Sequence, residues 1–315
     1  MTVSAPSETD AAQIASGFAG EPTQQVTRFP AGLAHYVFDV RLAGGASLVV
    51  RLGLPSARAA FTGAEYWSRT LRPIGVPLPE LLQSGDHAGM PYLILERLPG
   101  TDLGLVYRSL SIEQKKSLAE RIVGIQRTVG GLGEGLGFGY VAHPDGPFPH
   151  ASWRDVVQSS LERSRRRIAR AGVFSAELVA RVERELARRS GYLERVRSRP
   201  FLDDTTTKNV IVDAGRLRGI VDVDVVCYGD PLFTLALTRA ALSNAEEDPD
   251  YVTYWRDLLD LTGAQLDALS LYTAVFCLDF MGEVGHRFNR TDAIGADAGG
   301  AARLLGMLEA ALSEL

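Results

Sequence analysis

The chain has 315 residues, long enough for two domains of ordinary size with a sizeable buried core. A hydrophobic content of 46%, a charged content of 23% and a net charge of −5 are typical of a globular protein and argue against a general nucleic-acid binder, which needs a basic face. The two cysteines, Cys227 and Cys277, stand far apart, which argues against a disulfide framework and a cysteine-based zinc site.

The sequence also lacks the marks of a membrane or secreted protein. No apolar run approaches the roughly 20 residues that span a bilayer. Residues 1–10 have neither the basic nor the apolar region of a secretory signal. We therefore expect a cytoplasmic protein that has neither a membrane nor a nucleic acid as partner. The sequence leaves its oligomeric state open between a monomer and a homodimer.

Strand patterns dominate the first hundred residues. The first twenty or so residues are small and polar and are expected to form a flexible lead-in. Aromatic and β-branched residues at 35–42 and 47–52 flank a turn and predict a β-hairpin. A helix is predicted over 57–71, and two further strands around 80–82 and 92–98. We assign residues 1–98 to an N-terminal lobe, mainly an antiparallel sheet with one helix.

Helical patterns prevail after residue 100, and we assign 99–315 to a larger helical lobe. Ser111 and Gln114 form a capping box at the start of a helix that reaches about residue 129. Further helices are predicted over 151–171, over 175–197 and from 232 to the end, with a glycine-rich loop at 130–139 and a short β section at 201–226. The helix over 151–171 carries five arginines, which we interpret as a solvated face, with an anionic partner as the alternative: Arg163, Arg165, Arg166, Arg167 and Arg170.

Residues suited to catalysis or metal binding are concentrated in the β section. Asp204 and Asn209 bracket a polar loop, and Asp222 follows a strand, a turn and a second strand. A hairpin of this kind brings an Asp and an Asn that precede its first strand next to an Asp that follows its second. Converging carboxylate and amide oxygens suit Mg²⁺ together with a phosphate. The remaining carboxylate, Asp204, could take a proton from a hydroxyl group.

This spacing, with an Asp thirteen residues after the Asn, resembles the aminoglycoside phosphotransferase/choline kinase family. The resemblance extends to Tyr228-Gly-Asp-Pro-Leu232, Gly75-Val-Pro-Leu-Pro79 and Leu95-Glu-Arg-Leu-Pro-Gly100. It implies an α+β, protein-kinase-like fold of two lobes. It also implies a small-molecule kinase that moves the γ-phosphate of ATP or GTP to an alcohol group of an acceptor, with Mg²⁺ as cofactor.

The resemblance assigns roles to the residues of the loop. Asp204 would be the catalytic aspartate that orients or deprotonates the acceptor hydroxyl. Asn209 and Asp222 would hold Mg²⁺ at the nucleotide phosphates. Lys208, one of only three lysines, either neutralises the transferring phosphate or faces solvent.

Further roles fall in the N-terminal lobe. Arg51 stands where the family has a basic residue on the phosphates, and Glu65 on the following helix would be its partner. The backbone from Glu96 to Leu98 would meet the adenine base, and a loop at 32–35 would cover the phosphates.

Departures from the family pattern leave an alternative open. Leu202-Asp203 replaces the usual His-Gly before the catalytic Asp, which places a second carboxylate beside it. Asp224 is a candidate for a supporting hydrogen bond or a minor metal contact. The alternative is a kinase-fold nucleotide-binding pseudokinase or regulator without phosphotransfer. A protein kinase is disfavoured, because no activation-segment phosphosite pattern follows Asp222.

The acceptor is expected, from the resemblance, to be an aminoglycoside-like antibiotic or another hydroxylated amine or sugar, and a role in antibiotic resistance would follow. Asp279 and Glu283 lie four residues apart on one predicted helix face and are the preferred carboxylates for a cationic acceptor. A second acidic run, with Pro249 inside it, is interpreted as an exposed loop: Glu246, Glu247, Asp248 and Asp250.

Overall fold

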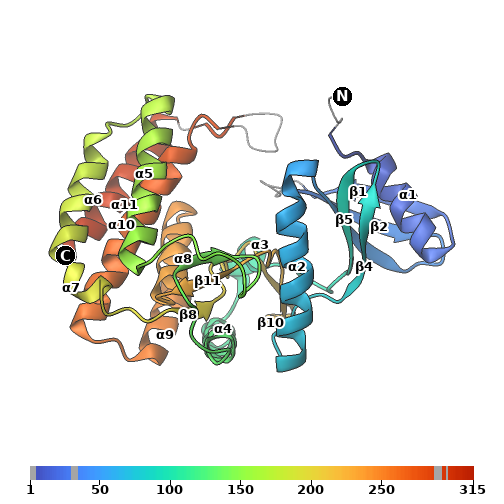
Figure 1. Cartoon of the computed structure of the whole chain (residues 1–315), viewed down its shortest axis with the longest axis horizontal. Helices are drawn as coiled ribbons and strands as arrows, with labels where there is room; N and C mark the ends of the chain where they lie inside the picture. Colours follow the sequence, from blue (N-terminus) through green and yellow to red (C-terminus); the bar gives the residue numbers. More distant parts are fainter. Residues whose placement is uncertain (1–4, 30–34, 287–292, 296) are drawn as a thin grey trace.

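The computed structural model describes residues 5–29, 35–286, 293–295 and 297–315. It has two parts, an antiparallel sheet with two helices and a larger helical part, and α2 (Arg58–Leu71) stands between the sheet and the helical part (Figure 1). The predicted division into a sheet lobe and a helical lobe is therefore confirmed as an α+β fold. Within the described residues, no helix combines the length and the apolar character needed to cross a bilayer.

The sheet lobe is a five-stranded antiparallel sheet in the order β1-β2-β3-β5-β4. Its strands are β1 (Thr23–Arg28), β2 (Tyr36–Leu42), β3 (Ser47–Leu52), β4 (Leu81–His87) and β5 (Met90–Glu96). β2 and β3 form the predicted hairpin, with Val37 opposite Arg51. Because β3 is central, its side chains are covered on both faces, and Arg51 is only 4% exposed.

The expected flexible lead-in is wrong, because a helix forms there. α1 (Glu8–Ala19) begins at a capping box between Ser7 and Asp10 and ends at Gly20, which has a left-handed conformation. Ala11, Ile14 and Ala15 of α1 are buried against the sheet. Small residues suggested disorder, but here they allow the helix to pack closely on the strands.

The helical lobe is built around α10 (Gly263–Glu283), in which nearly every residue from 268 to 278 is buried. A helix that is apolar on all sides must be enclosed by others. The remaining helices of this lobe are α3 (Leu103–Val106), α4 (Ile112–Gly130), α5 (Trp153–Ala171), α6 (Glu177–Arg188), α7 (Ser190–Leu193), α8 (Leu232–Asn244), α9 (Asp250–Leu259) and α11 (Ala298–Ser313). The predicted capping box of α4 is present, whereas the helix expected over 175–197 is divided into α6 and α7.

Two small sheets lie where the lobes meet. One has the order β10-β9-β6 and the other the order β7-β11-β8. Their strands are β6 (Thr101–Asp102), β7 (Gly139–Val141), β8 (Arg199–Phe201), β9 (Val210–Asp213), β10 (Arg216–Ile220) and β11 (Val226–Gly229). The antiparallel pairing of β9 with β10 is the predicted hairpin, and it brings the loop before β9 next to the segment after β10.

Helix α2 lies against the segment after β10. A Cβ atom on Gly63 would be 2.2 Å from the carbonyl oxygen of Asp224, so only glycine permits this approach. The Trp67 indole of the same helix donates a hydrogen bond to the Val141 carbonyl oxygen at 3.0 Å. The position of α2 is thus set by direct contact with the helical lobe.

We predict that Gly63→Ala destabilises the protein by about 1–3 kcal/mol, because the added methyl group has no space. The matched control is Gly124→Ala, in the interior of α4, where an added Cβ atom meets nothing within 4 Å. That change should stabilise the protein by up to about 1 kcal/mol. Urea unfolding of both variants measures the two effects, and equal effects would contradict the proposed close contact.

Candidate active site

The loop between β8 and β9 is held from behind by one side chain of α4. The Gln126 amide donates to the Leu202 carbonyl oxygen at 2.8 Å and to Thr205 Oγ1 at 3.2 Å, and it accepts from the Leu202 amide at 3.0 Å. Leu202 itself is buried. A leucine in place of the family's histidine can therefore serve as a packing residue, while Gln126 supplies the polar contacts.

Asp204 lies on this loop with its carboxylate reachable from solvent. Thr206 donates to Asp204 Oδ1 at 2.7 Å, and Lys208 Nζ lies 3.1 Å from Oδ2. Burial lowers the pKa of Lys208, but Asp204, with Asp222 and Glu283, more than offsets it, so that the pKa of Lys208 lies above its usual value. Lys208 therefore faces Asp204, although it remains accessible from the cleft.

Asn209 and Asp222 come together as the spacing predicts. The Asn209 side-chain amide donates to the Asp204 carbonyl oxygen at 3.0 Å, which leaves its own Oδ1 pointing elsewhere. The Val221 amide donates to the Asn209 carbonyl oxygen at 2.9 Å, so the chain reaches Asp222 directly beside the loop. Asp222 has φ +66°, a left-handed conformation that costs a non-glycine residue energy and often marks a functional position.

The predicted pair of Arg51 with Glu65 is wrong. Arg51 binds Asp224 instead, through two N–O contacts of 2.5 Å, and it lies 3.1 Å from Asp222. Glu65 pairs with Arg69 one turn along α2, at 2.6 Å. The physical reason is the position of Gly63, which brings the backbone of Asp224 against α2 and its carboxylate to the guanidinium group.

Asp224 is the site residue whose importance the sequence understated. It also receives a contact from His35 Nε2 at 3.0 Å. Burial alone would raise the pKa of Asp224, but Arg51 and His35 hold it well below its usual value. The remainder of the expected phosphate-covering loop lies outside the described residues. A glycine in α2 that matches no helix cap was the signal, within the sequence, of a close contact at this point.

Asp203 provides a second carboxyl group beside Asp204. It keeps some access to solvent but is surrounded by protein, and burial followed by the charge of Asp204 raises its pKa from 3.8 to about 7. Its charge, after burial, also raises the pKa of Tyr140 in β7 and of Cys227 in β11. Asp203 therefore lies at the inner wall of the cleft and not on its outer rim.

The predicted adenine-binding backbone follows β5. The Glu96 amide donates to the Glu80 carbonyl oxygen at 2.8 Å, and the Leu98 carbonyl oxygen accepts from the Arg97 guanidinium at 2.6 Å. Arg97 also pairs with Asp39 of β2 at 3.2 Å. These contacts fix the course of the chain as it crosses between the lobes.

Of the two carboxylates expected to bind a cationic acceptor, Asp279 is already paired. Arg163 lies 3.2 Å and Arg167 3.5 Å from Asp279 Oδ1, which Ser164 also approaches at 3.3 Å. Burial, followed by the charge of Asp279, raises the pKa of Glu283. The second acidic run is paired as well: Glu246 with Arg303 at 3.2 Å, Glu247 with Arg108 at 2.9 Å and Asp248 with Lys115 at 2.5 Å.

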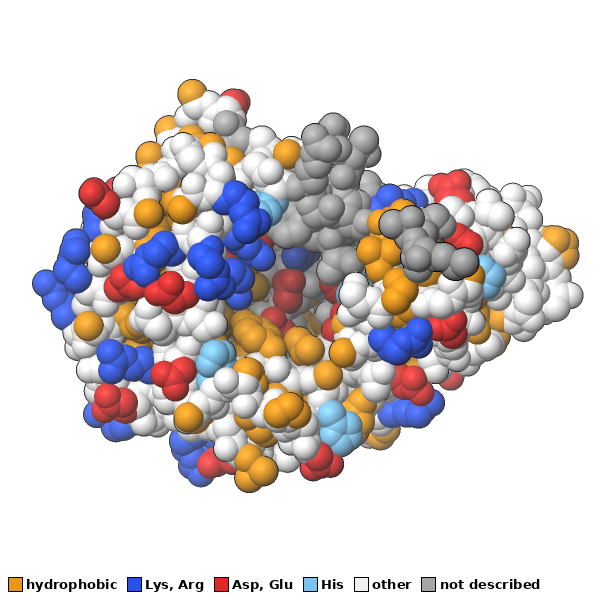
Figure 2. Space-filling view, turned by 45° about the horizontal axis from the view of Figure 1, so that its top comes forward, with side chains coloured by type: hydrophobic (Ala, Val, Ile, Leu, Met, Phe, Trp, Pro, Cys, Tyr) orange, Lys and Arg blue, Asp and Glu red, His pale blue; other side chains and the backbone are white. Residues whose placement is uncertain are grey.

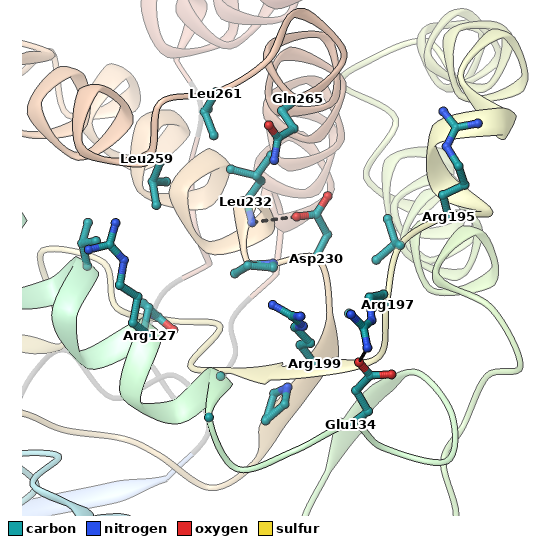
Figure 3. Close-up of a pocket in the computed structure, with 18 of the residues that line it drawn as sticks. Arg127, Glu134, Arg195, Arg197, Arg199, Asp230, Leu232, Leu259, Leu261 and Gln265 are labelled. Atoms are coloured by element: carbon teal, nitrogen blue, oxygen red, sulfur yellow. Dashed lines mark hydrogen bonds and ion pairs between the residues drawn. The ribbon is translucent and has the colours of Figure 1, made fainter.

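A cavity of about 940 Å³ lies behind Gln126, away from Asp204. We call the contacts of Gln126 with Leu202 and Thr205 the Gln126 clamp. Figure 3 shows the cavity surrounded by arginines from α4, from the segment after α7 and from β8, with Asp230 at its inner end. The Asp230 carboxylate accepts hydrogen bonds from Tyr192 at 2.8 Å and Tyr272 at 3.0 Å. Asp230, in the motif that resembles the family, therefore has a structural role that ties α8 to α7 and α10.

We predict that Asp224→Asn destabilises the protein by about 3 kcal/mol, because it leaves the buried Arg51 with only the more exposed Asp222 as ionic partner. Glu65→Gln, which breaks only the solvent-exposed pair with Arg69, should cost less than about 1 kcal/mol. Thermal and urea unfolding of the two variants give the comparison. A larger loss for Glu65→Gln would restore the pair expected from the sequence.

The Asp203 carboxyl should make stability depend on pH. In the unfolded chain it ionises near 3.8, whereas in the folded protein it keeps its proton up to about 7. The folded state therefore loses stability as the pH rises between these two values. Asp203→Asn should match the wild type in melting temperature near pH 4 and exceed it increasingly up to pH 7. A constant difference across that range would show that Asp203 has an ordinary pKa.

Comparisons with known proteins agree with this geometry. A sequence model described as the phosphotransferase enzyme family matches residues 25–271. No curated protein sequence matches the chain. Among solved structures, a thermostable mutant of aminoglycoside phosphotransferase APH(4)-Ia is 19% identical, with a TM-score of 0.70 over 96% of this chain and 98% of that one.

Two other solved structures have the same fold. The GDP and kanamycin complex of APH(2")-IIIa is 13% identical, with a TM-score of 0.69 over 98% of this chain and 99% of that one. A putative fructosamine-3-kinase from Thermobifida fusca is 16% identical, with a TM-score of 0.62 over 96% of this chain and 97% of that one. The family match spans well over half of the chain, and the fold agrees with it throughout. The chain belongs to the phosphotransferase enzyme family, which makes it an enzyme of the small-molecule kinase type.

Proposed function

We propose that the protein transfers the γ-phosphate of ATP or GTP to a hydroxyl group of a small molecule. The observation that carries this proposal is the convergence of Asp204 and Asn209, from the loop before β9, with Asp222, from the segment after β10, next to the buried Arg51. Solved relatives of the same fold are described as complexes with AMP-PNP and hygromycin B or with GDP and kanamycin. A hydroxylated amine or sugar, including an aminoglycoside-like antibiotic, is the acceptor class that these relatives indicate.

The residues present suit a magnesium-bound nucleotide. Asn209 directs its amide nitrogen to the Asp204 carbonyl, so its Oδ1 is available as a ligand, and Asp222 presents a carboxylate that is 54% exposed. Two protein oxygens, completed by phosphate and water oxygens, suit the oxygen ligands that Mg²⁺ prefers, and the ion would neutralise charge on the nucleotide phosphates.

Asp204 is in position to act on the acceptor. Its Oδ1 is held by Thr206, so the free lone pairs of Oδ2 face the cleft beside Lys208. A carboxylate placed in this way orients the acceptor hydroxyl and takes its proton as the new bond to phosphorus forms. Lys208 would attract the equatorial oxygens of the transferring phosphoryl group.

A pseudokinase remains the second candidate because of one observation. Arg51, the expected phosphate-binding cation, is bound by Asp224 and lies 3.1 Å from Asp222. A chain that keeps this contact in the presence of nucleotide would bind phosphates weakly. The two candidates therefore differ in whether nucleotide binding and phosphoryl transfer can both be detected.

We expect Mg²⁺-ATP or Mg²⁺-GTP to raise the melting temperature, with about 2.7 kcal/mol added at 100 times the dissociation constant. Asp222→Asn should lose most of this shift. Asp204→Asn should keep the shift but lose about 10²–10⁴-fold in transfer to an accepted hydroxyl, because only the acceptor side is impaired. A shift in the wild type without transfer to any acceptor would favour the pseudokinase, and no shift with either nucleotide would reject both candidates.

A further inference from the structure

We propose that the acceptor carries an anionic group, a carboxylate or a phosphate, which a stripe of arginines on α5 binds. We call Arg163, Arg166, Arg167 and Arg170 the arginine stripe. The inference rests on the proposed function and narrows its acceptor class. The acceptor would be a hydroxylated sugar or amine that is also an acid, and not a polycation.

The spacing of the stripe places its members together. Positions i, i+3, i+4 and i+7 of a helix lie on one face, so the four guanidinium groups project to the same side of α5. Arg165, on another face, pairs with Glu162 at 2.7 Å and with Glu183 at 2.5 Å. The five arginines therefore do not form one face of α5. Arg165 is paired with glutamates on one face, and the four arginines of the stripe lie on another.

The stripe has more positive than negative charge. Among the described residues, Asp279 is the one carboxylate in ion-pair contact with the stripe, through Arg163 and Arg167, and Glu283 acts on the same two arginines without such a contact. Arg166 and Arg170 are exposed, and their guanidinium groups have no hydrogen-bond or ion-pair partner among the described residues. Four arginines beside two carboxylates, Asp279 and Glu283, leave the group with a net positive charge.

The stripe borders the cleft that contains Asp204. Lys208, which pairs with Asp204, lies close enough to Glu283 for each charge to act on the other. Glu283 in turn interacts electrostatically with Asp279, Arg167 and Arg163. Figure 2 shows basic side chains gathered on the side of the hollow where α5 lies, with acidic and apolar side chains on its floor.

A polycationic acceptor does not suit the arginine stripe. It would have to displace Arg163 and Arg167 from Asp279 and then remain beside two further arginines. An anion meets the opposite situation, because guanidinium groups donate paired hydrogen bonds that match a carboxylate or a phosphate. The acceptor hydroxyl would then lie on the Lys208 side, toward Asp204.

The test uses four sugars that share a ring and differ in charge: glucuronate, glucose 6-phosphate, glucose and glucosamine. Their binding to the full-length protein in the presence of Mg²⁺-AMP-PNP is measured by calorimetry, and transfer is measured with Mg²⁺-ATP and Mg²⁺-GTP. We expect at least one of the two acids to bind about tenfold more tightly than glucose, and glucosamine to bind more weakly than glucose. The two acids separate carboxylate from phosphate as the preferred group.

Variants locate the effect. The double change Arg166→Gln and Arg170→Gln removes two exposed cations without disturbing Asp279, and it should reduce the preference for the acid mainly through KM. Arg163→Gln should reduce it further, whereas the control Arg165→Gln should leave it unchanged. Raised ionic strength should weaken the preference in the wild type.

The outcomes separate this inference from the proposed function. Tighter binding of glucosamine than of both acids, no acid bound more tightly than glucose, or an equal loss in Arg165→Gln would each overturn the anionic acceptor. The proposed kinase would survive these results if Mg²⁺-AMP-PNP binds in the same titrations. Absence of nucleotide binding would reject the kinase itself, and acid binding that depends on the stripe would still identify an anion site.

Discussion

The contact between Arg51 and Asp224 joins the two lobes, and much of the cleft depends on it. A central strand of the sheet contributes the cation and the segment after β10 contributes the anion, with Gly63 allowing α2 to come close enough. Burying two charges is favourable only when they are closely paired and hydrogen-bonded, and the two contacts between the Arg51 guanidinium and the Asp224 carboxylate provide that pairing. The neighbouring Asp222 lies between the arginine and the loop that carries Asp204.

The loop that carries Asp204 is held in place from the opposite side. Gln126 makes three hydrogen bonds to Leu202 and Thr205, so the loop that carries Asp204 is fixed to a long helix of the core. Behind this clamp lies a cavity, and in front of it lies the cleft. The buried Gln126 amide thus lies between the cleft and the cavity behind it. It supplies the polar contacts to this loop, in which Leu202 stands at the position of the usual histidine.

Much of the fold and the central site could be predicted from the sequence, because they depend on local signals. The β9–β10 hairpin needs only alternating residues and a turn, and it necessarily brings Asp222 to Asn209. The partner of Arg51 could not be predicted, because Asp224 lies far along the chain and reaches it only through tertiary packing at Gly63. The pairing of Asp279 with α5 was hidden for the same reason, and the helical character of residues 8–19 was masked by small residues.

The permanent charge of Arg51 gives the interlobe contact a particular character. A guanidinium group keeps its proton at every pH at which proteins fold, so deprotonation of the cation cannot release the lobes as it could with a lysine. The contact can be exchanged by another anion that competes with Asp224 for the same donors. Nucleotide phosphates are anions of this kind, so their arrival in the cleft would compete with Asp224 for Arg51.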